Sequence, residues 1–137
     1  MAWQVLLLKL PDALGTLSAL PADYVPPPLG NAEHVTERIA EVAGGAKLTL
    51  DVDGERLVVL RSDQFVIEAE LGGMTPLSVD RVLLSVLGSE DALPLVGALA
   101  RALEAQAVDC ETDAVLDADA IVPDTLRQWQ IRIEDLR

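Results

Sequence analysis

Hydrophobic residues recur along the chain with two different periods. Apolar residues occupy every second position in residues 46–53 and 64–71, which is the period of a strand that buries one face. Residues 31–45 instead carry apolar side chains at spacings of three and four, as a helix with one buried side does. A continuous apolar run at residues 5–8 predicts a strand buried on nearly both faces.

The remaining periodic segments complete the predicted order of elements. Residues 55–62 and 76–88 predict two more strands, residues 92–107 predict a second helix, and residues 107–111 predict a last strand. The expected order is therefore a strand, a helix, four strands, a helix, a strand and a tail.

Short turn sequences join the central strands. Asp53-Gly54 is typical of a two-residue type I′ hairpin turn, and Ser62-Asp63 and Gly72-Gly73 make the next two connections. Strands that follow one another through tight turns pair antiparallel. The sequence therefore predicts a single globular α+β domain over residues 1–137, with a mostly antiparallel sheet and two main helices packed on one face.

Capping residues mark the expected helix ends. Asn31 is a good N-cap for the first helix, and Gly44-Gly45 supplies its C-terminal stop. Asp91 is the expected N-cap of the second helix, because it places Pro94 in the first turn. The predicted buried stripes are Val35, Ile39 and Val42 on the first helix and Leu95, Leu99 and Leu103 on the second.

The tail after Pro123 fits two patterns. Its apolar residues alternate as in a strand at Trp129, Ile131 and Ile133, but Leu126, Trp129, Ile133 and Leu136 have helical spacing. Asp124 would serve as the N-cap, so we expect a short C-terminal helix.

Composition narrows the classes of partner. The 137 residues are 50% hydrophobic and only 3% aromatic, so the core is expected to be aliphatic. The formal net charge is −13, which argues against binding to nucleic acid or to an anionic membrane surface. The same charge favours a basic protein partner.

The cysteine content and the N-terminal sequence indicate the cellular compartment. Cys110 is the only cysteine, so no intrachain disulfide is possible. The apolar run at residues 5–8 has no basic residue before it and is followed by Lys9 and Pro11, unlike a signal peptide. No stretch reaches the length of about 18 apolar residues of a membrane span. We expect a cytoplasmic protein.

The densest group of carboxylates lies in residues 108–120, VDCETDAVLDADA. An EF-hand loop beginning at Asp109 would need Gly at its sixth position and Glu at its twelfth, where the chain has Ala114 and Ala120. The segment is therefore not an EF-hand. We predict that its acidic residues form the partner-binding site: Asp109, Glu111, Asp113, Asp117 and Asp119.

Two interpretations of this segment stay open. If residues 107–111 form a strand, Asp109 and Glu111 lie on one side and could share a hard cation with Asp113 or Asp117. Alternatively, the segment is an exposed edge strand whose carboxylates discourage pairing with other sheets.

Residues suited to catalysis are scarce. His34, the only histidine, is expected on the surface of the first helix. Cys110 lies between two acids, which would raise its thiol pKa, and we expect it to be a small apolar residue on the core face of the last strand. We predict no catalytic residue and no cofactor, and the balance favours a protein that is not an enzyme.

Several short segments resemble a group of small uncharacterised bacterial proteins. The resemblance extends from Phe65 to Asp117 and includes part of the tail, about half of the chain. The matching pieces within it are Phe65–Glu68, Val82–Gly88, Asp91-Ala92, Val108–Cys110 with Leu116-Asp117, and Gln128–Gln130. Relatives carry His or Arg in the strand before the glycine, where this chain has Ser85 and Leu87. The resemblance implies no particular activity.

Two functions follow from these observations. The first is a non-catalytic interaction or regulatory module, of the immunity-protein kind, that presents an acidic surface to a basic partner. The alternative is a small-ligand or divalent-metal-dependent activity at the acidic segment 109–117.

The second helix also predicts self-association. It has no charged residue from Ala92 to Ala100, and Gly97 would let another backbone approach closely. We expect a homodimer with a two-fold contact on this surface. The alternative is that the two helices pack side by side on one sheet and exhaust the apolar surface within the monomer.

Overall fold

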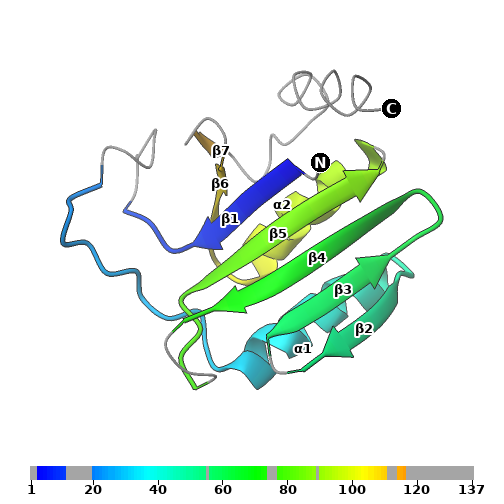
Figure 1. Ribbon diagram of the computed structural model, residues 1–137, viewed down its shortest axis with the longest axis horizontal. Coiled ribbons are helices and arrows are strands. Elements are labelled where there is room, and N and C mark those ends of the chain that lie inside the picture. The colour runs from blue at the N-terminus through cyan, green and yellow to red at the C-terminus, as the bar shows by residue number, and fades with distance from the viewer. Residues whose placement is uncertain are drawn as a thin grey trace.

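The sheet contains seven strands, and two helices accompany it (Figure 1). The structure is a computed structural model that describes residues 3–11, 20–54, 56–73, 77–88, 90–110 and 114–116. The helices are α1 (Ala32–Gly45) and α2 (Leu93–Ala102), with the 3-10 turn η2 (Glu90–Ala92) before α2. The strands are β1 (Trp3–Leu8), β2 (Thr49–Asp53), β3 (Leu57–Arg61), β4 (Phe65–Gly72), β5 (Arg81–Gly88), β6 (Gln106–Asp109) and β7 (Val115–Leu116).

The strands lie in the order β2-β3-β4-β5-β1-β6-β7, and each neighbouring pair is antiparallel. The first strand of the chain therefore lies inside the sheet, between β5 and β6. The prediction of an α+β fold with a mostly antiparallel sheet and two helices is confirmed. The predicted C-terminal helix lies outside the described residues.

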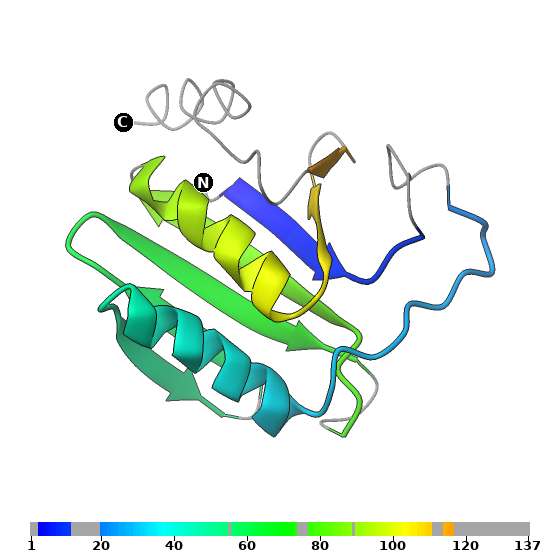
Figure 2. The ribbon, with the colours of Figure 1, turned by 180° about the vertical axis from the view of Figure 1, so that it is seen from behind.

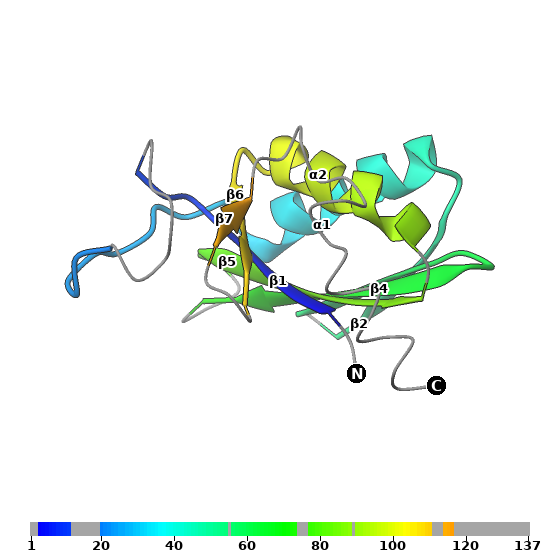
Figure 3. The same ribbon diagram turned by 90° about the horizontal axis from the view of Figure 1, so that it is seen from above.

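The two helices lie on the same side of the sheet (Figure 3), and they run next to each other in the view from behind (Figure 2). Their buried side chains join one hydrophobic cluster with alternate residues of the strands. One row of this cluster crosses four strands through paired residues, all nearly inaccessible to solvent: Val58, Ala69, Leu84 and Val5. The opposite face of the sheet, turned to the viewer in Figure 1, is called the open face below.

The predicted start of α1 is confirmed. Asn31 caps the helix, and its side-chain oxygen accepts a hydrogen bond of 2.7 Å from the backbone N–H of His34. Val35 and Ile39 are buried as predicted, while Ala43 takes the third buried position instead of Val42, which is only partly buried.

The predicted start of α2 is wrong by one residue. Asp91 lies within η2, so the N-cap falls on Ala92, which makes no side-chain capping bond. Pro94 is in the first turn, as expected. The helix ends at Ala102, earlier than predicted, because Glu104 adopts a left-handed backbone conformation with φ of 53° and residues 106–109 pair with β1.

The hairpin between β2 and β3 has a longer turn than expected. Asp53 still pairs with Leu57, so the connection contains residues 54–56 and is not a two-residue type I′ turn. Gly54, with φ of 70°, supplies the left-handed conformation that this turn requires. Asp53 therefore belongs to the strand itself, at a fixed register with β3.

The face of the second helix that carries Gly97 is buried within the chain. Gly97, expected to admit a second copy, is buried together with Val96, Leu99 and Ala100. This surface therefore offers no point of close approach to another backbone, and the homodimer stays a prediction. Within the described part of the chain, no helix is long and apolar enough to span a membrane.

Candidate functional site

Carboxylates gather on the open face over β2, β3 and β4. Strand alternation directs Glu68 and Glu70 away from the helices, since Ile67, Ala69 and Leu71 of the same strand are buried beneath them. The register brings Asp53 and Glu70 to opposite sides of Leu57, and Asp51 and Glu68 to opposite sides of Val59. We call this surface the acidic face: Asp51, Asp53, Glu68 and Glu70.

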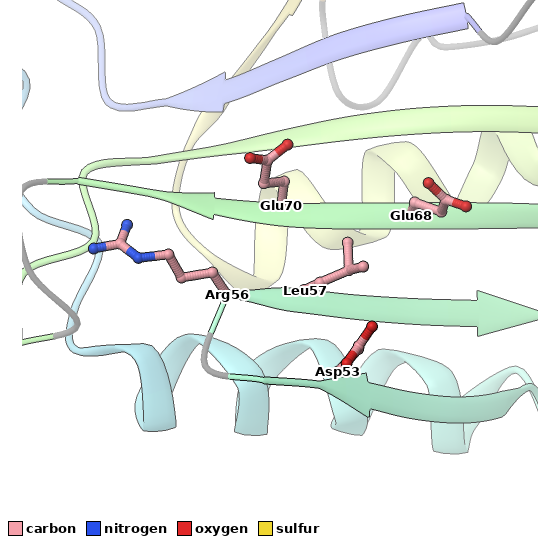
Figure 4. A pocket seen from close by; sticks show the side chains of 5 residues that line it. All are labelled: Asp53, Arg56, Leu57, Glu68 and Glu70. Atoms are coloured by element: carbon pink, nitrogen blue, oxygen red, sulfur yellow. The ribbon is translucent and has the colours of Figure 1, made fainter.

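The acidic face is hollowed at its centre. A shallow groove of about 590 Å³ is lined by Asp53, Arg56, Leu57, Glu68 and Glu70 (Figure 4). Leu57 of β3 forms an apolar spot between the carboxylates of the two strands that flank it, β2 and β4. Such a groove is suited to a long cationic side chain, whose methylene stem contacts the leucine while its charged end meets the acids.

Two arginines on this surface are already engaged. The Arg56 guanidinium donates hydrogen bonds of 3.3 and 3.0 Å to the backbone carbonyl oxygens of Leu71 and Gly73. Figure 4 shows its side chain extending away from Asp53 and Glu68. Arg61 lies 3.5 Å from the Asp51 carboxylate in an exposed ion pair. With four carboxylates and two guanidinium groups, the surface keeps a negative balance.

A second groove lies beside the acidic face, on the helix side of β2. It measures about 430 Å³ and lies between the first turns of α1, the end of β2 and Leu77. Val52 and Leu77 line it and are 54% and 82% exposed, which is unusual for large aliphatic side chains. Glu33 and Glu37 of α1 stand on its other side.

The predicted partner-binding segment has a different environment. Asp109 ends β6, lies opposite Val5 of β1 and is only 8% exposed. Its backbone N–H donates to the Ala114 carbonyl oxygen at 2.9 Å. Glu111, Asp113, Asp117 and Asp119 lie outside the described residues. The strand is also not an edge, because β7 pairs with its outer side.

The inward and outward sides predicted for the strand at residues 107–111 are therefore wrong. Ala107 and Asp109 point to the helix side, so Cys110 follows on the other side and is exposed, not buried in the core. A shift of one residue exchanges all inward and outward positions of a strand. His34 is exposed, as predicted.

Within residues 3–11, 20–54, 56–73, 77–88, 90–110 and 114–116, no three His, Cys, Asp or Glu side chains are grouped so that they could hold a metal ion. The four carboxylates of the acidic face belong to two strands, Asp51 and Asp53 to β2 and Glu68 and Glu70 to β4.

Sequence reasoning overlooked this surface although the signals were present. Glu68 and Glu70 are outward positions of an alternating strand, and Asp51 is an outward position of another. The missing information was the register of the two hairpins, which places β2 and β4 on either side of β3.

No protein-family model matches the chain, and the searches of curated proteins and of solved structures likewise found no match.

Proposed function

We propose that the protein is a non-catalytic interaction or regulatory module that binds a basic protein partner through the acidic face. The observation that carries this proposal is the convergence of Asp51 and Asp53 from β2 and of Glu68 and Glu70 from β4, on either side of β3, onto one open surface. The immunity-protein role suggested by the charge is one form of such a module.

The electrostatics fit recognition of a basic surface. A formal net charge of −13 attracts a cationic partner from a distance, and the acidic face concentrates the attraction at one place. Complementary charge of this kind mainly increases the association rate and the specificity of a complex. Because screening reduces the range to about 10 Å at 0.1 M salt, binding should weaken as the salt concentration rises.

The location of the site differs from the one expected from carboxylate density. Asp109 is too deeply buried to offer its carboxylate to a large partner. The acidic face instead presents exposed side chains on a rigid sheet, which positions charges more reproducibly than a loop. These exposed carboxylates, held at fixed positions on the sheet, favour a partner with a basic surface.

The test compares two variants with the same total charge. One neutralises the acidic face with Asp51→Asn, Asp53→Asn, Glu68→Gln and Glu70→Gln. The other neutralises four exposed carboxylates elsewhere with Asp23→Asn, Glu41→Gln, Asp63→Asn and Glu104→Gln. Removing four negative charges takes the formal net charge from −13 to −9 in both.

The probe is a fluorescent nonalysine peptide, titrated at low and at physiological salt. We expect the acidic-face variant to bind about tenfold more weakly than the control variant, which corresponds to about 1.4 kcal/mol. Four exposed ion pairs of about 0.2–1 kcal/mol each are sufficient for this loss. Equal losses in both variants would show that only the net charge matters and would contradict the proposed surface.

A further inference from the structure

The strand β2 is the outer strand of the sheet on the side of the acidic face. It is first in the sheet order and pairs with β3 on one side. The structure shows no second strand pairing with it among the described residues. The edge of such a strand presents backbone donors and acceptors that another chain can use.

The neighbouring hairpin shows which backbone groups of β2 face outward. Ser62 N–H donates to the Phe65 carbonyl oxygen at 3.0 Å, and Leu71 N–H donates to the Arg56 carbonyl oxygen at 2.7 Å. The even-numbered residues of β3 therefore direct their backbone groups towards β4. Backbone direction alternates along an antiparallel strand, so the odd-numbered residues 57, 59 and 61 direct theirs towards β2.

The partners of these odd-numbered residues are Asp53, Asp51 and Thr49. Their backbone groups are consequently used within the sheet. By the same alternation, the N–H and carbonyl groups of Leu50 and Val52 point to the outer edge. The edge thus offers two residues spaced to bond with an added strand.

The side chains around this edge differ on its two sides. On the helix side, exposed Val52 and Leu77 line the 430 Å³ groove with Glu33 and Glu37. On the open side, the outward side chains of the strand are acidic: Asp51 and Asp53. An added strand would place its alternate residues against these two different surfaces.

We propose that β2 accepts an extended basic segment of the partner as an additional strand of the sheet. This mode is β-strand addition, in which backbone hydrogen bonds give affinity and alternate side chains give specificity. An apolar residue of the segment packs in the groove against Val52 and Leu77, while the residues before and after it bring lysine or arginine to Asp51 and Asp53. The inference rests on the proposed function and specifies how the partner binds.

A second copy of this chain is a poorer occupant of the same edge. Pairing β2 with itself about a two-fold axis would bring the Asp51 and Asp53 carboxylates of both copies onto one face. Like charges opposite each other destabilise a strand pair. The acids thereby select a basic strand and discourage pairing between identical chains.

The experiment uses a nine-residue peptide of alternating lysine and valine as the probe. A control peptide of the same sequence carries N-methyl groups on two adjacent central residues, which block hydrogen bonding along both of its edges. Amide hydrogen exchange of the intact protein is followed by NMR with and without each peptide. In the free protein we expect faster exchange at Leu50 and Val52 than at Asp51 and Asp53.

The probe should slow exchange at Leu50 and Val52 at least about tenfold, and the methylated peptide should not. Val52→Lys should weaken probe binding at least about tenfold, whereas Val25→Lys should not, because Val25 is 78% exposed in a connection away from the groove. The two substitutions change the net charge equally, so a difference between them reports the edge.

Three other results would overturn the inference. Binding of both peptides with equal affinity, with amide shifts on β4 but no protection at Leu50 and Val52, would reject strand addition and leave the proposed function in place. Absence of binding by both peptides at low salt would reject the two together. Protection of the same amides without peptide, rising with protein concentration, would identify a second copy as the occupant.

Discussion

The two ends of the open face, over β2–β4 and over β1, β6 and β7, carry different side chains. Over β2 and β4 most outward side chains are acidic and form the acidic face, with Leu57, Val59 and Arg61 of β3 between them. Over β1, β6 and β7 they are mostly aliphatic, with Gln4 and Gln106 as the polar exceptions. In that half a second, smaller hydrophobic cluster forms from Leu8, Leu10 and Val108, with Leu6, Leu20, Tyr24 and Val115 packed against it.

Hydrogen bonds fix the residues that pack over the aliphatic half, Leu10 and Tyr24 among them. The Tyr24 hydroxyl donates to the Lys9 carbonyl oxygen at 2.8 Å, which ties the connection before α1 to the end of β1. The Gln106 side chain accepts from Leu10 N–H at 2.9 Å and donates to the Leu10 carbonyl oxygen at 3.4 Å. The chain therefore supplies part of its own covering layer on this side.

The difference separates two demands on one sheet. Aliphatic outward positions need cover, and the protein provides it from its own connections. Charged outward positions do not need cover, so the acidic face can stay open without loss of stability. Substitutions in the aliphatic half should therefore change the stability of the fold, and substitutions in the acidic half should change the binding of a partner.

The largest effect on stability is expected for Leu8→Ala. Leu8 is 5% exposed in the smaller cluster, and truncating a buried leucine costs about 2–5 kcal/mol of unfolding free energy. Leu87→Ala is the control on the same face, because Leu87 is 38% exposed and should cost less than about 1 kcal/mol. Urea unfolding measures both, and equal losses would abolish the distinction between covered and open positions.

Arg56→Met should have the next largest effect, and it divides stability from binding. The substitution removes two hydrogen bonds to the carbonyl oxygens of Leu71 and Gly73 and should cost about 1–2 kcal/mol. It also removes a positive charge from the groove, so nonalysine should bind more tightly. Arg61→Met, which breaks an exposed ion pair, should cost less than about 1 kcal/mol. Weaker peptide binding by Arg56→Met would contradict the charge argument.

A smaller effect is expected for Tyr24→Phe, which keeps the ring and removes one hydrogen bond. Losing the bond to the Lys9 carbonyl oxygen should lower the unfolding free energy by about 0.5–1.5 kcal/mol. Nonalysine binding should not change, because Tyr24 belongs to the aliphatic half. A change in peptide affinity would show that the two halves are coupled.

Much of the fold could be predicted because long segments carry unambiguous periods. The alternation of Phe65, Ile67, Ala69 and Leu71 determines both the strand and its buried side, and Asn31 marks the first helix. Helix α2 began later than predicted because a 3-10 turn, which shares the sequence preferences of a helix start, precedes it.

The acidic face could not be predicted, because a stretch of sequence rich in carboxylates need not place those carboxylates together on the surface. Residues 108–120 hold the most carboxylates, yet Asp109 turns inward, since its short strand contains few residues to fix the phase and its pairing with β1 decides it. In the acidic face, by contrast, Asp53 and Glu68 are 15 positions apart in the sequence. The two pairs of acids lie on one surface only because β2 and β4 both pair with β3.

The smallest stability effect is expected for Glu68→Gln combined with Glu70→Gln. Both side chains are exposed, so neutralising them should change the unfolding free energy by less than about 0.5 kcal/mol. The sign should be stabilising at low salt, because the substitution relieves repulsion among the acids of the acidic face. At 1 M salt, where the screening length is about 3 Å, the stabilisation should disappear. Unfolding followed at both salt concentrations, beside nonalysine titrations, measures the two effects together. If the double variant is strongly destabilised, these glutamates support the sheet and the acidic half is not a surface kept free for binding.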